Sequence, residues 1–119
     1  MSEHPLADPG LEVSPQDVKR RLDAGDDVQV IDVREQYEWD AGRIAGVRHI
    51  ELERLASQAE TIDKDKPVVF QCRLGARSLM AAQAFRRAGY DAWSMAGGLQ
   101  AWHEDGLPLE PENGTVADH

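Results

Sequence analysis

The sequence predicts an α/β domain with a mainly parallel sheet, and two observations support that prediction. Short apolar runs rich in β-branched residues alternate along the chain with segments of helical periodicity. The links between them are short, and several contain glycine or proline. Alternation of this kind is typical of a layered fold in which helices cover a parallel sheet.

Length, charge and hydropathy restrict the class of protein. A chain of 119 residues is long enough for one domain around a single core and leaves no room for a second catalytic domain. No apolar run approaches the ~18 residues of a membrane span, and the amino terminus lacks the features of a secretory signal. The formal net charge of -9 opposes binding to nucleic acid. We therefore expect a cytoplasmic protein with neither a membrane nor a nucleic acid as its partner.

The first half of the chain predicts two helical segments around a strand. Ser14 followed by Pro15, with an acidic residue three positions after the serine, predicts a helix start, and Gly25 marks its end. Residues 28–31 form an apolar run that predicts a strand with a buried carboxyl end. Residues 35–40 are expected to form a short helix or turn. This order brings the polar residues after the strand to a sheet edge, where open α/β folds place their chemistry.

The second half repeats the alternation of strand and helix. Leucines and alanines at three-and-four spacing predict a helix within residues 51–60, and alanines with Phe85 predict another over residues 79–88. A last helix carrying Trp102 is expected after Gly98. Strands are expected at residues 67–71 and 91–95, and residues 47–50 are expected to form a loop entering a short strand.

Composition divides the chain into three parts. Residues 1–10 contain prolines, a glycine and charges, and are expected to form a flexible leader. Residues 11–108 carry the alternating strands and helices of the domain. From residue 109 the chain is acidic and contains proline, so residues 109–119 are expected to form a flexible tail.

Cys72 is the only cysteine of the chain and lies in the predicted turn between a strand and a helix. The nucleophilic form of cysteine is the thiolate, which an ordinary thiol adopts only to a few per cent at neutral pH. Three features would stabilise the anion together: the guanidinium groups of Arg73 and Arg77, the amides of a turn containing Gly75, and the positive end of the following helix. A buried, inert cysteine would gain nothing from such neighbours. The pattern therefore favours a reactive thiol.

Four motifs in register give the chain its resemblance to a known family. They are Asp32-Val33-Arg34-Glu35 after a strand, Gly42-Arg43-Ile44-Ala45-Gly46-Val47, the loop from Cys72 to Ser78, and Gly97-Gly98-Leu99-Gln100-Ala101-Trp102. In their order and spacing the chain resembles the rhodanese-like sulfurtransferases, over roughly residues 11–108. The resemblance implies a three-layer domain with a mainly parallel central sheet of about five strands flanked by helices.

The resemblance also implies a reaction and a set of site residues. Cys72 would be the catalytic nucleophile, taking a sulfane sulfur from a small anionic donor such as thiosulfate and passing it as a persulfide to cyanide or a thiol. Residues that support the loop would be Asp32, Arg34 and Ser78. Neither a metal nor an organic cofactor is implied. The residues expected to line the substrate pocket are Arg73, Leu74, Gly75, Ala76 and Arg77.

Two other functions stay open at this point. Protein tyrosine phosphatases and arsenate reductases also use a cysteine in an anion-binding loop, but phosphatases place five residues before the arginine, which would put it at position 78, where this chain has Ser78. The four residues between Cys72 and Arg77 favour a cradle for sulfur over one for a tetrahedral oxyanion. The second alternative is a persulfide carrier that docks on a partner protein. Since the chain has no second cysteine, the acceptor must come from outside it.

Overall fold

The computed structural model describes residues 10–119, so that residues 1–9 of the predicted leader lie outside the described residues. Within residues 10–119 the strands are β1 (Glu12–Val13), β2 (Gln29–Asp32), β3 (Arg48–His49), β4 (Val68–Gln71) and β5 (Ala92–Met95). The α-helices of the same range are α1 (Pro15–Asp23), α2 (Gln36–Ala41), α3 (Leu55–Gln58), α4 (Ala76–Arg87) and α5 (Gly98–Glu104). Two 3-10 turns flank α3, η1 (Leu52–Arg54) and η2 (Ala59–Thr61).

The strands within the described residues form one five-stranded sheet in the order β1-β5-β4-β2-β3, and every pairing is parallel. The predicted α/β class with a parallel sheet is therefore confirmed. β4 occupies the centre, with Gln71 opposite Asp32 on one neighbour and Phe70 opposite Ser94 on the other. Cys72 thus follows the central strand at the carboxyl edge of the sheet, where parallel sheets place ligands.

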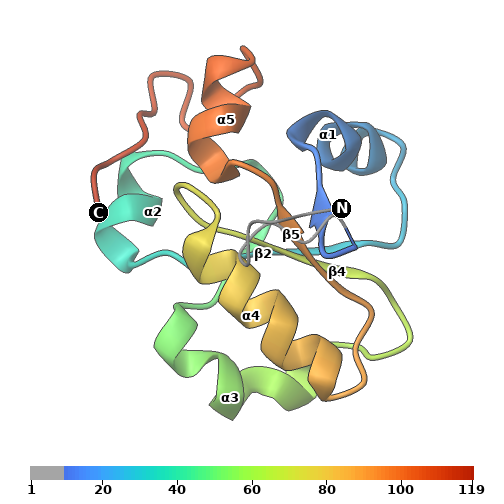
Figure 1. Ribbon diagram of the computed structural model, residues 1–119. Coiled ribbons are helices and arrows are strands. Elements are labelled where there is room, and N and C mark those ends of the chain that lie inside the picture. Colours follow the sequence, from blue (N-terminus) through green and yellow to red (C-terminus); the bar gives the residue numbers. More distant parts are fainter. Residues whose placement is uncertain (1–9) are drawn as a thin grey trace, which may run out of the picture.

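Helices cover both faces of the sheet, which makes a three-layer structure (Figure 1). Successive residues of a strand point to opposite faces, and β2 follows this rule. Ile31 packs in the cluster that contains residues of α3 and α4, and Val30 packs in the cluster that contains residues of α1 and α5. Burial on both faces explains why adjacent residues such as Val30 and Ile31 in β2, and Val68 to Phe70 in β4, are all apolar rather than alternating with polar residues.

The start of α1 follows the sequence closely, whereas the helix expected within residues 51–60 does not form as one element. Ser14 caps α1 by accepting a hydrogen bond from the Asp17 amide at 3.0 Å. Residues 52–61 are instead split into η1, α3 and η2. The hydroxyls of Ser57 and Thr61 donate to carbonyls three residues earlier, at 2.9 and 2.7 Å, and such bonds compete with the α-helical pattern.

The longest helix within residues 10–119 is α4, with 12 residues. A helix needs about 20 predominantly apolar residues to cross a bilayer. Among the described residues, none of the helices combines the length and apolar character for such a span.

Candidate active site

The loop that carries Cys72 joins the central strand to the longest described helix. β4 ends at Gln71, and α4 begins at Ala76, three residues earlier than the periodicity of the sequence predicted. Gly75 precedes the helix with φ of 108°, a left-handed conformation that residues with a side chain rarely adopt. Because α4 begins this early, the residues from Ala76 to Ser78 form its first turn. Their amides have no partner within the helix itself.

The Cys72 sulfur lies under these amides. The Gly75 N–H donates to Sγ at 3.1 Å and the Ser78 N–H at 3.4 Å, while Ser78 Oγ lies 3.5 Å from the sulfur. The Cys72 side chain is almost fully buried. Amide donors and the positive end of a helix stabilise negative charge on an atom held in this position. The sequence predicted that amides of the turn would face the cysteine; the amides that donate to its sulfur are those of Gly75 and of Ser78, a residue expected only to support the loop.

The Ser78 hydroxyl links the loop to the neighbouring strand. Ser78 Oγ donates to the Gly75 carbonyl at 3.1 Å and lies 2.7 Å from Ser94 Oγ on β5. All three groups are buried. Ser94 was not singled out in the sequence, since a serine inside a strand has no distinctive local pattern. Its hydroxyl fixes the first turn of α4 against the sheet.

The first residues of α5 hold the Cys72 loop in place through backbone hydrogen bonds. The Leu99 N–H donates to the Cys72 carbonyl at 2.7 Å, and the Gln100 N–H donates to the Arg73 carbonyl at 2.9 Å. These contacts require a very close approach at Gly98, where a Cβ atom would lie 2.4 Å from the Cys72 carbonyl oxygen. The paired glycines at residues 97 and 98 were the only sequence signal of this contact.

Asp32 and Arg34 form a buried ion pair beside the site. The Arg34 guanidinium donates to both oxygens of Asp32, at 2.7 to 3.0 Å, and neither side chain is exposed. Arg34 also donates to the carbonyls of Glu38 and Gly42, at 3.2 and 2.8 Å. The pair ties the end of β2 to α2 and to the residue that follows it, and a role of Asp32 and Arg34 in loop support stays a prediction.

Arg77 is held by a carboxylate that the sequence analysis missed. Its Nη1 and Nη2 donate to the two oxygens of Glu38 at 2.8 and 3.0 Å, and Glu38 has no exposed surface. Burial by itself raises the pKa of Glu38, but the hydrogen bonds from Arg77 and from the Glu35 N–H outweigh it and hold that pKa below its ordinary value. The Glu38 hydrogen bond likewise raises the pKa of Arg77. Glu35 and Glu38 form a capping box at the start of α2, which is a pattern visible in the sequence.

Arg73 has an incomplete set of partners. Its Nη2 lies 3.2 Å from Asp118 Oδ1 of the tail, and Asp118 is 96% exposed. Its Nε is buried and has no hydrogen-bond partner among residues 10–119. A guanidinium offers five N–H donors in a planar fork. Within the described residues, Arg73 therefore has free N–H donors that can bind an anion, whereas Arg77 is already paired with Glu38.

The tail, residues 109–119, runs past α2 to the site (Figure 1). The Thr115 N–H donates to the Ala41 carbonyl at 2.8 Å, and the Tyr37 hydroxyl donates to the Asp118 carbonyl at 3.0 Å. His119 Nε2 lies 2.9 Å from Glu35 Oε2. Composition alone predicted a flexible acidic tail and gave no sign of where it would lie.

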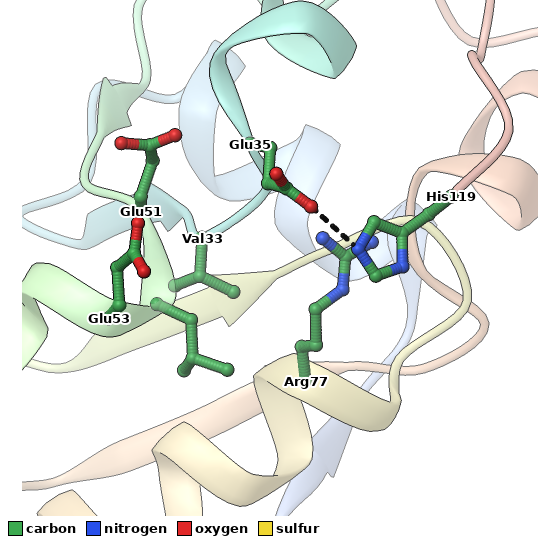
Figure 2. A pocket seen from close by; sticks show the side chains of 7 residues that line it. Val33, Glu35, Glu51, Glu53, Arg77 and His119 are labelled. Atoms are coloured by element: carbon green, nitrogen blue, oxygen red, sulfur yellow. Dashed lines mark hydrogen bonds and ion pairs between the residues drawn. The ribbon is translucent and has the colours of Figure 1, made fainter.

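Two adjoining cavities meet at Arg77 and His119. One, of about 300 Å³, is lined by Cys72, Arg73, Leu74, Ala76, Arg77 and His119. The other, of about 340 Å³, has Arg77 and His119 on one side and the acidic side chains of Glu51 and Glu53 on the other (Figure 2). The first cavity brings together most of the residues expected to line the substrate pocket, whereas Gly75 contributes its amide to the sulfur.

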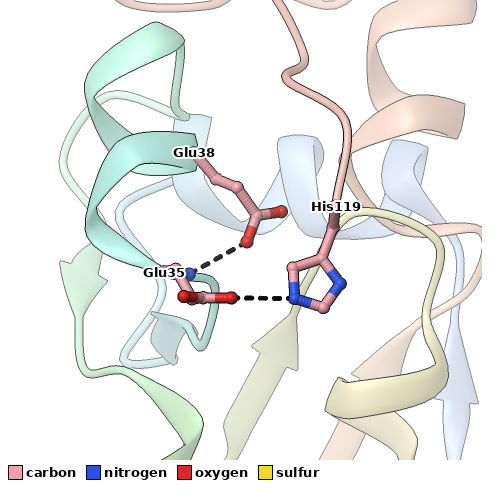
Figure 3. A group of neighbouring side chains, drawn as sticks. All are labelled: Glu35, Glu38 and His119. Atoms are coloured by element: carbon pink, nitrogen blue, oxygen red, sulfur yellow. Dashed lines mark hydrogen bonds and ion pairs between the residues drawn. The ribbon is translucent and has the colours of Figure 1, made fainter.

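Glu35, Glu38 and His119 place three potential metal-ligand atoms within 4.8 Å of one another (Figure 3). Both oxygens of Glu38 already accept hydrogen bonds from Arg77, and one also accepts the Glu35 N–H at 3.0 Å. A cation would have to displace Arg77. The three side chains therefore form a hydrogen-bonded network with Arg77.

Comparisons with known proteins agree with this geometry. Residues 14–105 match the model of the rhodanese-like domain. The chain is 34% identical over 97 residues to the putative sulfurtransferase YtwF of Bacillus subtilis, covering 82% of this chain and 94% of that protein. It is 32% identical over 98 residues to the thiosulfate sulfurtransferase GlpE of Pseudomonas aeruginosa, covering 82% and 87% of the two chains.

Solved structures show the same fold. The crystal structure of a rhodanese-related protein from Thermoplasma volcanium superposes with a TM-score of 0.76 at 27% identity, covering 83% of this chain and 96% of that one. The family match spans all four motifs that carried the resemblance in the sequence. The chain therefore belongs to the rhodanese-like domain family.

Proposed function

We propose that this protein is a sulfurtransferase that carries a sulfane sulfur on Cys72. The observation that supports the proposal most is the placement of the Cys72 sulfur under two amides, in a cavity that Arg73 and Arg77 also line. The names of the relatives, YtwF as a putative sulfurtransferase and GlpE as a thiosulfate sulfurtransferase, support the same class of reaction.

The first half-reaction takes sulfur from a small anionic donor, for which thiosulfate is the proposed example. The Cys72 thiolate attacks the outer sulfur of thiosulfate and forms a new S–S bond. The S–S bond of the donor breaks, and sulfite leaves with its electron pair. The persulfide anion that remains carries the charge of the former thiolate, and the Gly75 and Ser78 amides are the donors closest to the site of that charge.

The second half-reaction returns the thiolate. Cyanide or a thiolate attacks the outer sulfur of the persulfide, the S–S bond to Cys72 breaks, and the Cys72 sulfur keeps the electron pair. Thiocyanate or a new persulfide is released. Such a covalent carrier predicts ping-pong kinetics. Cys72 is the single cysteine, so this acceptor comes from solution or from another protein.

The two arginines of the loop have different roles in this proposal. Arg77 is committed to a carboxylate with no exposed surface, so releasing it to bind a donor would leave a buried charge unpaired. Arg73 has a buried, unpartnered Nε, and its carboxylate partner is almost fully exposed. Arg73 is therefore the residue for the donor anion, and Arg77 positions the first turn of α4.

A direct assay tests the proposal. The wild-type protein should release sulfite from thiosulfate and form thiocyanate when cyanide is present, and Cys72→Ser should do neither. Hydrolysis of para-nitrophenyl phosphate at a comparable rate, with no sulfite released, would favour a phosphatase instead.

A second candidate, delivery of sulfur to a partner protein, is favoured by exposed apolar side chains beside the loop. Leu74 and Met80 are 57% and 59% exposed and line a groove of about 310 Å³ next to the first turn of α4. Exposed apolar residues beside a reactive group are typical of docking surfaces. With reduced thioredoxin as the probe acceptor, Met80→Glu should slow transfer to the protein and leave transfer to cyanide unchanged. Equal rates to thioredoxin in wild type and variant would exclude this groove as its docking site.

A further inference from the structure

The end of the chain contributes two side chains to the surroundings of Cys72. Asp118 contacts Arg73 of the loop, and His119 lines the cavity that contains the Cys72 sulfur. Both are fixed by contacts to α2 and the residue before it, through the Tyr37 hydroxyl and the Glu35 carboxylate. The family match ends at residue 105, so these tail residues lie beyond the part of the chain that the family describes.

Asp118 occupies the guanidinium that an anionic donor would need. Its Oδ1 lies 3.2 Å from Arg73 Nη2, while the neighbouring Nε is buried and has no partner within the described residues. A donor dianion and the Asp118 carboxylate both seek the N–H donors of this one fork. Arg77 is less available, because two of its N–H groups are bound to the buried Glu38 carboxylate.

We propose that Asp118 is a specificity-determining residue that competes with anionic sulfur donors for Arg73. The inference rests on the proposed function, in which Arg73 binds the donor anion. Asp118 lowers the preference of the site for anionic over neutral reagents, and a donor binds as the tail carboxylate leaves the guanidinium.

Exposure makes this competition possible. Asp118 is 96% exposed and its contact is a surface ion pair, so water replaces Arg73 at little cost once the carboxylate swings away. The carboxylate at Arg77 differs in this respect, because Glu38 has no exposed surface. Asp118 is therefore the carboxylate that yields to a donor, and Glu38 is the one that stays.

Other acidic residues near the site add to the negative charge of Asp118. The adjoining cavity is lined by Glu35, Glu51 and Glu53, and Arg77, the arginine among its described lining residues, is paired with Glu38. Arg73 is thus the cation on which the attraction of a donor dianion depends. The charge on Asp118 opposes that attraction directly.

Alkylation of Cys72 tests the inference without any turnover. Iodoacetate is an anion and iodoacetamide is neutral, and with each the thiolate forms a C–S bond while iodide leaves with its electron pair. In Asp118→Asn the ratio of the iodoacetate rate to the iodoacetamide rate should rise about two- to five-fold, the range expected for loss of a surface ion pair. Glu112→Gln removes an equal charge from an exposed position of the same tail and should leave the ratio as in wild type. An unchanged ratio in Asp118→Asn, or an equal rise in both variants, would overturn the inference.

Thiosulfate kinetics separate this inference from the proposed function. The KM for thiosulfate should fall about two- to five-fold in Asp118→Asn at an unchanged kcat, and the effect should vanish in an Arg73→Gln background. If wild type forms no persulfide, the proposed function fails whatever the alkylation ratio shows. If persulfide forms but Asp118→Asn changes neither the alkylation ratio nor the KM for thiosulfate, only the role of Asp118 fails.

Discussion

Arg77 on α4 and Glu38 on α2 face each other through two hydrogen bonds of 2.8 and 3.0 Å, and Glu38 is fully buried. The same carboxylate accepts the Glu35 N–H at 3.0 Å. The pair therefore joins the helix that follows Cys72 to the segment that follows β2. Arg77, which the sequence predicts to line the substrate pocket, thus also ties two elements of the site together.

Glu38→Gln should lower the free energy of unfolding. The glutamine amide has the same shape and keeps one acceptor oxygen. It removes the charge and replaces the other oxygen with an NH2 donor, which faces the N–H donors of Arg77. We expect a loss of about 1–3 kcal/mol, measured by chemical denaturation at pH 7. The matched control is Glu53→Gln, an exposed residue, which should change stability by less than about 0.5 kcal/mol. Equal effects of the two substitutions would contradict the role assigned to Glu38.

Stability should also depend on pH through Glu38. Its pKa in the folded state lies below its ordinary value of 4.5, so between the two values the unfolded state binds more protons. The contribution of the pair is therefore complete above about pH 4.5 and is lost as the pH falls through the folded-state pKa. The stability difference between wild type and Glu38→Gln should narrow on acidification in this window. A difference that stays constant or widens would contradict the sign of the shift.

Ser78→Ala should weaken the loop while leaving its amide in place. The substitution removes the hydroxyl that bridges the Gly75 carbonyl and Ser94 Oγ, both of them buried. We expect a stability loss of about 1–3 kcal/mol from the unsatisfied groups, together with slower alkylation of Cys72 by iodoacetamide. Ser57→Ala, at an exposed position, serves as the control. Unaltered stability and alkylation in Ser78→Ala would show that the hydroxyl does not order the loop.

Gly98→Ala should be more harmful than Gly106→Ala. Both glycines have positive φ, at 61° and 76°, so both substitutions strain the backbone, at a cost of about 1–3 kcal/mol each. Only at Gly98 would the new Cβ also meet backbone, 2.4 Å from the Cys72 carbonyl oxygen, whereas Gly106 has open space. The midpoint temperature of thermal unfolding and the yield of persulfide should both fall further in Gly98→Ala than in Gly106→Ala. Similar losses in the two variants would contradict the close approach of α5 to the loop.

Substitution of the two loop arginines should affect different measured quantities. Arg73→Gln should raise the KM for thiosulfate several-fold with little change in unfolding free energy, since its partner Asp118 is exposed. Arg77→Gln should lower stability, because it leaves the Glu38 carboxylate buried without its cation. Donor titrations and denaturation of both variants measure the two effects. A KM that rises only in Arg77→Gln would reverse the assignment.

Much of the fold was predictable because its signals are local. The Ser14-Pro15 helix start and the apolar runs that became β2, β4 and β5 depend on neighbours in the sequence. The edge strand β1 was missed, since its two residues carry no periodicity and pair only with β5. Residues 51–60 were predicted as one helix because apolar spacing does not register the hydroxyl bonds of Ser57 and Thr61.

The site was predictable where one stretch of chain builds it. The turn around Cys72, its glycine and its arginines are contiguous, so their proximity follows from the sequence. Glu38, Ser94 and Asp118 reach the site from α2, β5 and the tail, and only the folded chain brings them there. The sequence therefore did not reveal the carboxylate that holds Arg77.

The most direct test of the account is the intact mass of the protein after treatment with thiosulfate and removal of excess reagent. The wild-type chain should gain the mass of one sulfur atom, the gain should disappear on addition of cyanide, and Cys72→Ser should show no gain under the same conditions. A wild-type protein that stays at its original mass, or a Cys72→Ser variant that gains the same sulfur, would contradict transfer through a Cys72 persulfide.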